Sequence, residues 1–239
     1  MKNNCFRTQN SSKIQHSLYS LYSRIYKNNR LSYQHATLVL SAMSSATVSS
    51  VPAPTIYQIK IVLVGIEPPI WRTVLCKSDA TLAEFHDVIQ VAMGWNDSHL
   101  HKFNVEDREI GNAEFRLDDY CDDAEDEREI TLEDVAPSFE YEYDFGDGWV
   151  HDVHIEKEVP YDAKVSYPLC IAGERKCPPE DSGGVWGYQS TLDALADGTI
   201  DDDRREWMEE FTGGEPWDAE EFNLEMVNWN SHATRWRMA

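Results

Sequence analysis

The stretch FEYEYDFGDGWVHDVHIEKEV, residues 139–159, alternates between side chains of opposite character at every second position. Its first half places aromatic residues between acids: Phe139, Tyr141, Tyr143 and Phe145. The Gly-Asp-Gly sequence at residues 146–148 then interrupts the alternation, which is typical of a tight turn. A period of two on both sides of a turn predicts a β-hairpin. The second strand carries four side chains on one face, Trp149, His151, Val153 and Ile155, so we expect His151 to face the core.

The segment before this hairpin has the patterns of two strands, a helix and a third strand. IYQIKIVLVG, which begins at Ile56, and WRTVL, which begins at Trp71, are rich in β-branched residues and predict strands. Residues 78–94 have helical spacing, with Ser78 or Asp79 as the expected N-cap and Gly94 as the end. HLHKFNV predicts a strand with four residues on one side: His99, His101, Phe103 and Val105.

The C-terminal third has helical spacing in three places. Apolar residues recur at intervals of three and four between Trp186 and Asp197, and again over residues 201–211 and 218–229. The first two of these segments end at glycines, which favour helix termination. The order of elements therefore predicts an α+β fold: a mostly antiparallel β-sheet, one early helix packed on it, and a helical C-terminal third.

The charge of the chain is distributed very unevenly. Glu67 is the first acidic residue, and residues 1–55 carry six Lys and Arg. The remaining residues hold 15 Lys and Arg against all 43 Asp and Glu, a net charge of −28. A polyanionic body repels phosphate backbones, so we expect a protein partner rather than a nucleic acid. No apolar run approaches the ~18–20 residues of a membrane span, and the sequence does not determine the oligomeric state.

These features also suggest the domain boundaries. Residues 1–54 are rich in Ser, Asn and Tyr and end in SAMSSATVSSVPAPT. We interpret them as a disordered or mis-started N-terminal extension, with a targeting segment as the alternative, and Met43 is a candidate internal start. Residues 55–239 form the expected domain. The five cysteines are an odd number without a dense framework, which favours a reducing, cytoplasmic location.

Two segments carry an unusual concentration of polar residues. DDYCDDAEDEREITLED, residues 118–134, lacks the spacing of a calcium loop, so we expect a solvated loop leading into a short helix. CPPEDSGGVWGY, residues 177–188, combines prolines, acids and glycines. We expect Glu180 and Asp181 to satisfy a helix N-terminus, and Trp186 and Tyr188 to pack inside. No GK[ST] sequence follows the glycines, so nucleotide binding is not indicated.

Several long strings together resemble the plasmid pRiA4b ORF-3-like family: PPIWRTVL, TLAEFHDVIQVAMGWNDSHLHKF, YEYDFGDGWVHDVHIE, YPLCIAGERKCPPEDSGGVWGY and TLDAL. The resemblance runs in order from about Ile56 to Trp229 and implies an α+β domain. It implies little chemistry, and it implies an association with plasmids and transposons. Members of the family commonly have a further cysteine where this chain has Ser182. This difference weakens the hypothesis of a zinc site in which Cys121 or a histidine completes the coordination by Cys170 and Cys177.

Some relatives carry a resolvase-like label, which this sequence does not favour. A serine resolvase needs a nucleophilic serine among clustered arginines and a basic helix-turn-helix. After residue 55 this chain has only nine arginines, which are scattered. On electrostatic grounds we therefore do not expect a resolvase role.

Two classes of function compete, and a third idea is that the acidic body mimics DNA. The first class is a binding or adaptor domain without catalysis, associated with mobile genetic elements. Its candidate pocket contains the following residues: Trp95, His99, His101, Asp144, Asp147, Trp149, His151, Glu180, Asp181, Trp186 and Tyr188. The second class is a metal-dependent, hydrolase-like enzyme. Its cofactor candidate is a divalent ion, which would be bound by four residues: His99, His101, Asp147 and His151.

Overall fold

The computed structural model describes residues 53–112 and 124–233, with side chains described as far as Asn228. These residues belong to one unit, Ala53–Ala239. The predicted extension, residues 1–54, lies almost wholly outside the described residues, as do Cys121 and the acidic residues 118–123.

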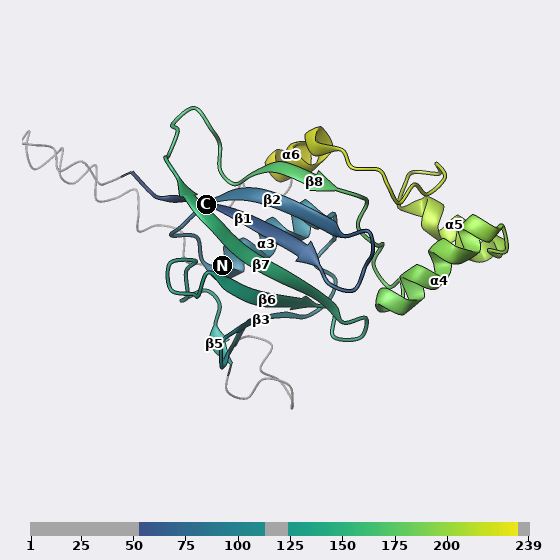
Figure 1. The fold of residues 1–239 in the computed structure, drawn as a ribbon, viewed down its shortest axis with the longest axis horizontal. Helices are drawn as coiled ribbons and strands as arrows, with labels where there is room; N and C mark the ends of the chain where they lie inside the picture. The colour runs from purple at the N-terminus through teal and green to yellow at the C-terminus, as the bar shows by residue number, and fades with distance from the viewer. Residues whose placement is uncertain (1–52, 113–123, 234–239) are drawn as a thin grey trace, which may run out of the picture. The chain divides into compact units, whose positions relative to one another are not determined.

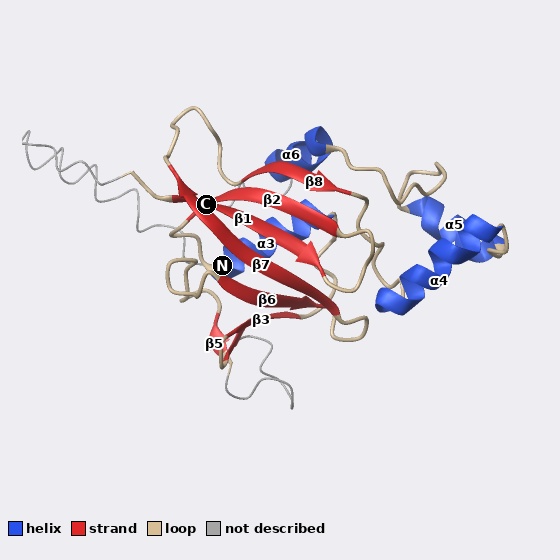
Figure 2. Cartoon of the chain, viewed as in Figure 1, coloured by secondary structure: helices blue, strands red, loops and turns tan. Residues whose placement is uncertain are grey.

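One mixed but mostly antiparallel sheet organises the described residues (Figures 1 and 2). Its strands are β1 (Ile56–Leu63), β2 (Ile70–Lys77), β3 (His101–Val105), β4 (Arg108–Gly111), β5 (Glu125–Asp126), β6 (Ser138–Tyr143), β7 (Trp149–Val159) and β8 (Leu169–Glu174). Their order in space is β5-β4-β3-β6-β7-β1-β2-β8. Neighbouring strands are antiparallel except for the short parallel pair β4–β5. The predicted α+β class with a mostly antiparallel sheet is confirmed.

The predicted hairpin is the β6–β7 pair. Tyr143 lies opposite Trp149 and Phe139 lies opposite Val153, so the register follows directly from the short turn. The predicted inward face of β7 is buried at Trp149, His151 and Val153. Because successive side chains of a strand alternate between faces, Asp152 and His154 point to solvent.

Helix α3 (Leu82–Met93) packs on one face of the sheet (Figure 1). Its apolar stripe, which includes Phe85 and Ile89, is buried in the core. The predicted N-cap at Ser78 or Asp79 is wrong, since Thr81 is the cap. The Thr81 hydroxyl accepts from the Glu84 amide while the Glu84 carboxylate accepts from the Thr81 amide, which satisfies two free donors at once. Gly94, with φ of 92°, ends the helix as predicted.

The C-terminal third is not simply helical, which corrects the sequence-based expectation. It begins with β8, which pairs with β2 and extends the sheet. Helices α4 (Gly184–Asp197), α5 (Asp202–Glu210) and α6 (Leu224–Ala233) follow. The last helix begins at Leu224 rather than at residue 218, because the Asn223 side chain accepts from the Met226 amide and starts the helix there. In the part of the chain that the structure describes, no helix has both the length and the apolar character needed to cross a membrane.

Strand β8 forms one edge of the sheet and is contacted there by α6. The Asn228 side-chain amide donates to the Cys170 carbonyl at 2.9 Å, and its carbonyl oxygen accepts from the Cys170 amide at 3.0 Å. One side chain of α6 therefore satisfies a main-chain donor and a main-chain acceptor on the outer side of β8.

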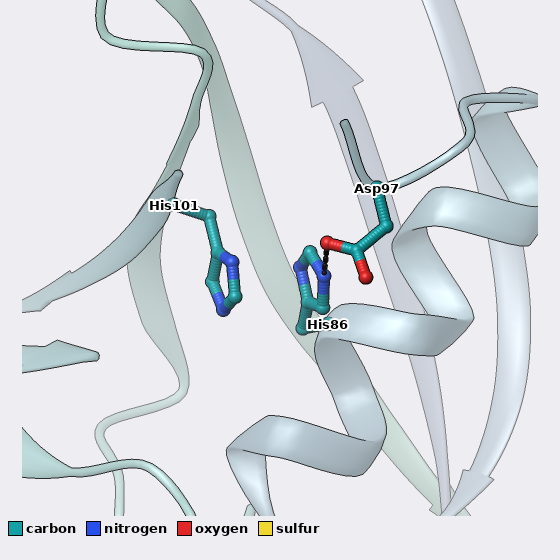
Figure 3. Close-up of side chains that lie close together, drawn as sticks. All are labelled: His86, Asp97 and His101. Carbon is teal, nitrogen blue, oxygen red and sulfur yellow. Dashed lines mark hydrogen bonds and ion pairs between the residues drawn. The ribbon is translucent and has the colours of Figure 1, made fainter. Parts of the chain in front are cut away.

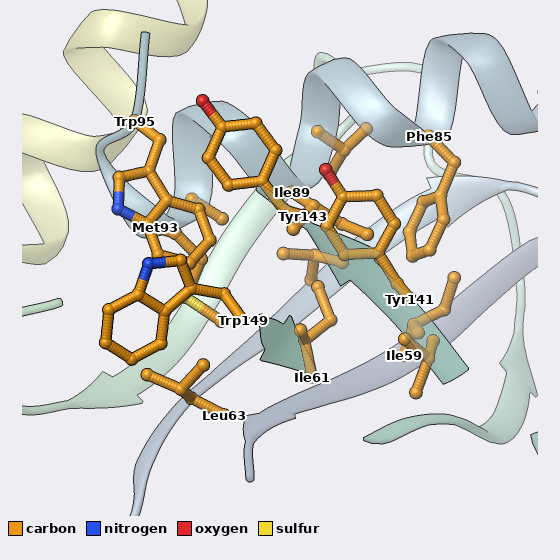
Figure 4. Packing of buried hydrophobic residues seen from close by; sticks show 14 of the residues in the cluster. Ile59, Ile61, Leu63, Phe85, Ile89, Met93, Trp95, Tyr141, Tyr143 and Trp149 are labelled. Carbon is orange, nitrogen blue, oxygen red and sulfur yellow. The ribbon is translucent and has the colours of Figure 1, made fainter. Parts of the chain in front are cut away.

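The core lies between α3 and the sheet and is rich in aromatic residues. Figure 4 shows Trp95, Tyr143 and Trp149 gathered beside α3, and the Trp95 and Tyr143 rings stack with centroids 4.9 Å apart. Burial of such large side chains supplies much of the free energy of folding, since each aromatic side chain removes ~150–250 Å² from water. These residues position the hairpin turn next to the loop that follows Lys176.

Arg72 is a buried charged residue that ties three elements together. Its guanidinium donates to the Ala92 carbonyl at the end of α3, to Trp71 of β2, and to Glu174 and Arg175 at the end of β8, each at 2.8 Å. Burial lowers the pKa of Arg72. All four acceptors are main-chain carbonyls, so this side chain holds backbone segments rather than forming an ion pair.

Candidate functional site

The loop at residues 177–184 packs against the turn of the hairpin. The Asp147 carboxylate accepts from the Gly183 amide at 2.9 Å. Gly184 lies so close to the turn that an added Cβ would be 2.4 Å from the Asp147 carbonyl oxygen. Nearer the core, the Tyr143 hydroxyl donates to Glu180 at 3.0 Å, and the Asn96 amide donates to the same carboxylate at 2.8 Å. The loop thus faces the hairpin.

The expected role of the two acids at the start of α4 is wrong. The N-cap is Gly183, which has no side chain to cap the helix. Glu180 instead points to Tyr143 and Asn96. The carboxylate that contacts the start of the helix is that of Asp147 in the hairpin, which accepts from the Gly183 amide. The sequence could not indicate this contact, because it joins residues that are far apart in the chain.

His99 lies among three carboxylates where this loop meets the hairpin. Its Nε2 is 3.3 Å from Asp181 Oδ1, 3.6 Å from Asp144 Oδ2 and 3.7 Å from Glu180 Oε2. The Nε2 atom is buried and has no hydrogen-bond partner among the described residues. The side chains of Asp144 and Glu180 are each 9% exposed, whereas Asp181 is 73% exposed. The group is therefore anchored on one side and open to solvent on the other.

The backbone of the hairpin turn orients Asp144 towards His99. Asp144 has a positive φ of 55°, a conformation that aspartate tolerates better than most residues. Its Oδ1 accepts from the Gly146 amide at 3.0 Å and from the Asp147 amide at 3.3 Å. The turn therefore uses one carboxylate oxygen and leaves Oδ2 directed at His99.

His101 lies apart from His99, although the sequence placed both on one side of a strand. Strand β3 begins only at His101, so His99 belongs to the preceding loop. The His101 ring lies against the His86 ring (Figure 3). The two rings stack with centroids 3.5 Å apart and planes within 6° of parallel. His101 Nε2 is 2.7 Å from Glu127, and His86 Nε2 is 2.9 Å from Asp97.

This stacked pair is a poor arrangement for a metal ion, even though His86, Asp97 and His101 place ligand atoms within 4.8 Å of one another. Imidazole binds metals along its lone pair, in the plane of the ring. An ion at ~2.1 Å from both nitrogens would lie far outside both of these parallel planes. Each ring also has a hydrogen bond to a carboxylate, and His86 Nδ1 lies 2.8 Å from the Tyr141 hydroxyl. Hydrogen bonding therefore accounts for the His86–His101 pair.

His151 is buried in the core, as predicted, and lies away from the carboxylates. Its Nδ1 is 3.3 Å from the Tyr141 carbonyl, and the Trp95 ring packs edge-on against it. Burial lowers the pKa of His151 to about 4, so the ring is neutral near pH 7. The structure does not bring His99, His101, Asp147 and His151 together into one of the metal-sized groups found among the described residues.

The remaining aromatic candidates divide between the core and the surface. Trp95, Trp149 and Tyr188 are buried, and Tyr188 packs edge-on against Trp217. Trp186, which was expected to pack, is 87% exposed. The first turn of α4 thus directs its two aromatic residues to opposite environments.

The cysteines do not form a metal knuckle in the described part of the chain. Cys170 and Cys177 are free and buried. Burial raises the pKa of Cys177 to about 12 and also raises that of Cys170, so both thiols are protonated near pH 7. A thiolate, rather than a thiol, binds metals. Ser182 donates to the Pro179 carbonyl and stabilises the loop.

A cavity of about 400 Å³ lies between the end of α3, the loop at 176–180 and residues 211–227. Its apolar lining includes four side chains from the C-terminal segment: Phe211, Trp217, Phe222 and Met226. No sequence motif indicated that these residues belong to a site. Their spacing resembles that of core-facing positions, and only the position of α6 against α3 brings them around one hollow.

The fold and these sites define a class of protein: a single-sheet α+β domain with a loop-to-hairpin carboxylate cluster and an adjacent cavity. The chain belongs to the Plasmid pRiA4b ORF-3-like protein family, whose profile matches residues 55–226. This confirms the resemblance that the sequence motifs indicated.

Two relatives are similar over most of their own length. An uncharacterized protein, y4hQ, from Sinorhizobium fredii is 34% identical over 179 residues, which covers 73% of this chain and 89% of that protein. The crystal structure of MM3350, a protein of unknown function from Methanosarcina mazei Go1, has a TM-score of 0.64 and 33% identity. The match covers 73% of this chain and 97% of MM3350. Neither name states an activity, so the comparisons indicate no catalytic function.

Proposed function

We propose that this domain is a non-catalytic binding or adaptor domain that recognises a basic protein segment with a large apolar side chain. The observation that supports this proposal is the cavity of about 400 Å³ beside α3. Its size is within the range of ~300–1,000 Å³ that is typical of ligand clefts.

The mouth of the cavity exposes apolar groups that a partner would cover. Phe211 is 43% exposed and Met226 is 56% exposed, although both line the cavity. Exposed aromatic residues next to a hollow are frequent binding hot spots, and the flexible thioether of methionine adapts to different partners. These two side chains are the expected anchors for an apolar residue of the partner.

The charge around the cavity favours a cationic partner. Glu215 and Glu221 line it and are exposed, and the whole chain has a formal net charge of −22. Lys176 already shows how this surface holds a cation: its Nζ lies 4.9 Å from the centre of the Trp217 ring and pairs with Glu221. A Lys or Arg of a partner would meet the same kinds of group.

The same acidic surface leads us to propose a protein partner rather than a nucleic acid, because phosphate backbones are repelled. The buried, free thiols fit a reducing compartment, and we propose a cytoplasmic location. The sequence-based link to mobile genetic elements makes basic proteins encoded on such elements the first group of partners to screen.

Peptides test this proposal directly. Fluorescent peptides that carry Trp or Leu between Lys and Arg residues are expected to bind the full chain, whereas peptides with Glu in place of Lys and Arg are not. Phe211→Ala and Met226→Ala should weaken binding at least about fivefold, corresponding to ~1 kcal/mol. Fluorescence anisotropy at low and moderate salt provides the measurement.

Trp186→Ala is the matched control, since Trp186 is an exposed aromatic residue that does not line the cavity. Its affinity for the peptides should equal that of the wild type. Equal affinities for Phe211→Ala and the wild type would place the binding elsewhere and refute the proposal.

A metal-dependent hydrolase is the second candidate function, and His99 is the residue that favours it. Its ring nitrogen faces carboxylates at a partly open surface, whereas His101 and His151 are engaged elsewhere. Any such chemistry would therefore need ligands other than the set that the sequence suggested.

A further inference from the structure

We propose that His99, Asp144 and Asp181, assisted by Glu180, bind a divalent transition-metal ion such as Mn²⁺ or Zn²⁺. All four residues belong to the candidate pocket expected from the sequence, but His101, Asp147 and His151 of the expected metal set are not among them. It does not depend on the peptide-binding function proposed above.

The spacing of the ligand atoms is that of a coordination sphere. The three carboxylate oxygens lie 3.3–3.7 Å from His99 Nε2. Around an ion with bonds of ~2.1 Å, ligand atoms lie about 3.4 Å apart in a tetrahedron and about 3.0 Å apart at neighbouring octahedral positions. The ligand atoms of His99, Asp144 and Asp181 all lie within 4.8 Å of one another. One ion would thus fit between them with little movement.

One buried polar atom points into this space without a hydrogen bond, and a carboxylate oxygen faces it. His99 Nε2 is buried and unpartnered among the described residues. Asp144, whose side chain is 9% exposed, uses only Oδ1 in its hydrogen bonds there, so Oδ2 is left facing His99. A buried polar atom without a partner costs ~1–3 kcal/mol. An ion would satisfy His99 Nε2 and would bind Asp144 Oδ2 at the same time. If His99 were simply an ion-pair donor, Nε2 would be aimed at one carboxylate rather than between three.

The local charge also calls for a cation. Asp144, Glu180 and Asp181 converge on one point, and within the described residues none of them pairs with a lysine or an arginine. Carboxylates gathered in this way repel one another. A divalent ion would neutralise two of the three charges, while the Tyr143 and Asn96 bonds already stabilise the third, on Glu180.

The type of ligand indicates the type of ion. One imidazole nitrogen with carboxylate oxygens suits Mn²⁺ and Zn²⁺, because Ca²⁺ and Mg²⁺ prefer oxygen alone and thiolate-seeking ions prefer sulfur. Asp181 is 73% exposed, so the ion would keep an open side for water. Bound there, the ion would join the loop at 177–184 to the hairpin turn.

Titration of the full chain with one ion at a time tests the proposal. After treatment with chelator and dialysis, Mn²⁺ alone and Zn²⁺ alone are titrated by calorimetry, and at least one is expected to bind with one ion per chain. Asp181→Asn should weaken that binding at least about tenfold, since even residues that only support a ligand typically matter that much. Because Asp181 is exposed, this variant should fold as the wild type does, which the melting temperature checks.

Asp152→Asn is the matched control because it makes the same charge change at an exposed position of β7; it should bind as the wild type does. For the Mn²⁺ complex, spin-echo modulation from a bound imidazole nitrogen should vanish in His99→Gln and persist in His154→Gln. The proposal is overturned if neither ion binds the wild type, if Asp152→Asn weakens binding as much as Asp181→Asn, or if the nitrogen signal survives in His99→Gln.

Discussion

Replacing Arg72 by methionine should destabilise the protein severely, because no other side chain within residues 53–112 and 124–228 donates to the same carbonyls. Arg72 is 3% exposed and donates to four main-chain oxygens in three elements. One of them, the Ala92 carbonyl, belongs to the last turn of α3, where a carbonyl has no partner within the helix. Methionine fills a similar volume but donates nothing.

The magnitude follows from the acceptors that are left unsatisfied. Each buried carbonyl without a donor costs ~1–3 kcal/mol, so four such groups set an upper range of ~4–12 kcal/mol. Removal of a buried guanidinium also removes its own desolvation cost, which amounts to several kcal/mol. We therefore expect Arg72→Met to lower the free energy of unfolding by about 3–5 kcal/mol, a large share of the ~5–15 kcal/mol of a typical domain.

Urea unfolding followed by tryptophan fluorescence measures this change. Arg72→Lys should recover only a minor part of the loss, because a single ammonium group cannot reach four separate carbonyls. Arg128→Met, on the surface, should change the free energy by less than ~0.5 kcal/mol. A loss below ~1 kcal/mol in Arg72→Met, or wild-type stability in Arg72→Lys, would contradict this reasoning.

Two further predictions concern the hairpin and its contact with α4. Burial lowers the pKa of His151 to about 4, below the ~6.5 of a histidine in an unfolded chain. The neutral ring therefore contributes its full stability above pH 6.5. This contribution is lost as the pH falls towards 4. Between pH 7 and pH 5 the free energy of unfolding, measured with urea, should fall by ~2 kcal/mol more in the wild type than in His151→Gln. If the stabilities of the two proteins changed with pH in parallel, another group would be responsible. Gly184→Ala would place a Cβ 2.4 Å from the Asp147 carbonyl, whereas Gly198→Ala has the same left-handed φ and no atom within 4 Å. Gly198→Ala should lower the free energy of unfolding by ~1–2 kcal/mol, and Gly184→Ala should lower it clearly more. Thermal melting measures both losses. Equal losses would mean that the loop moves away from the turn without cost.

The sequence was most informative where a regular period coincided with burial. The hairpin was predictable because Tyr141, Trp149 and Val153 belong to a period of two on either side of the turn, and its inner face is buried as expected. Helix α3 was predictable from Phe85 and Ile89 for the same reason. Strand β8 was missed because LCIAGE has no clear alternation and is defined by its pairing with β2.

The candidate site depended on contacts that no local pattern encodes. His99 and His101 looked equivalent on a common strand, yet β3 begins at His101 and only His99 reaches the loop that holds Asp181. Asp147 was expected as a metal ligand, and it accepts from the Gly183 amide. Motifs identified the segments that matter, but the partner of each side chain came from pairings between residues far apart in the chain.

Asn228 suggests how the sheet avoids joining another one. The free edge of a strand can recruit a strand from a second chain and begin a fibre. On β8, the amide group of Asn228 imitates a peptide unit and occupies the Cys170 donor and acceptor that such a strand would use. At the opposite edge, β5 has only two residues, too few to serve as a template. The two ends of this sheet thus resist polymerisation by different means, a single side chain at one and brevity at the other.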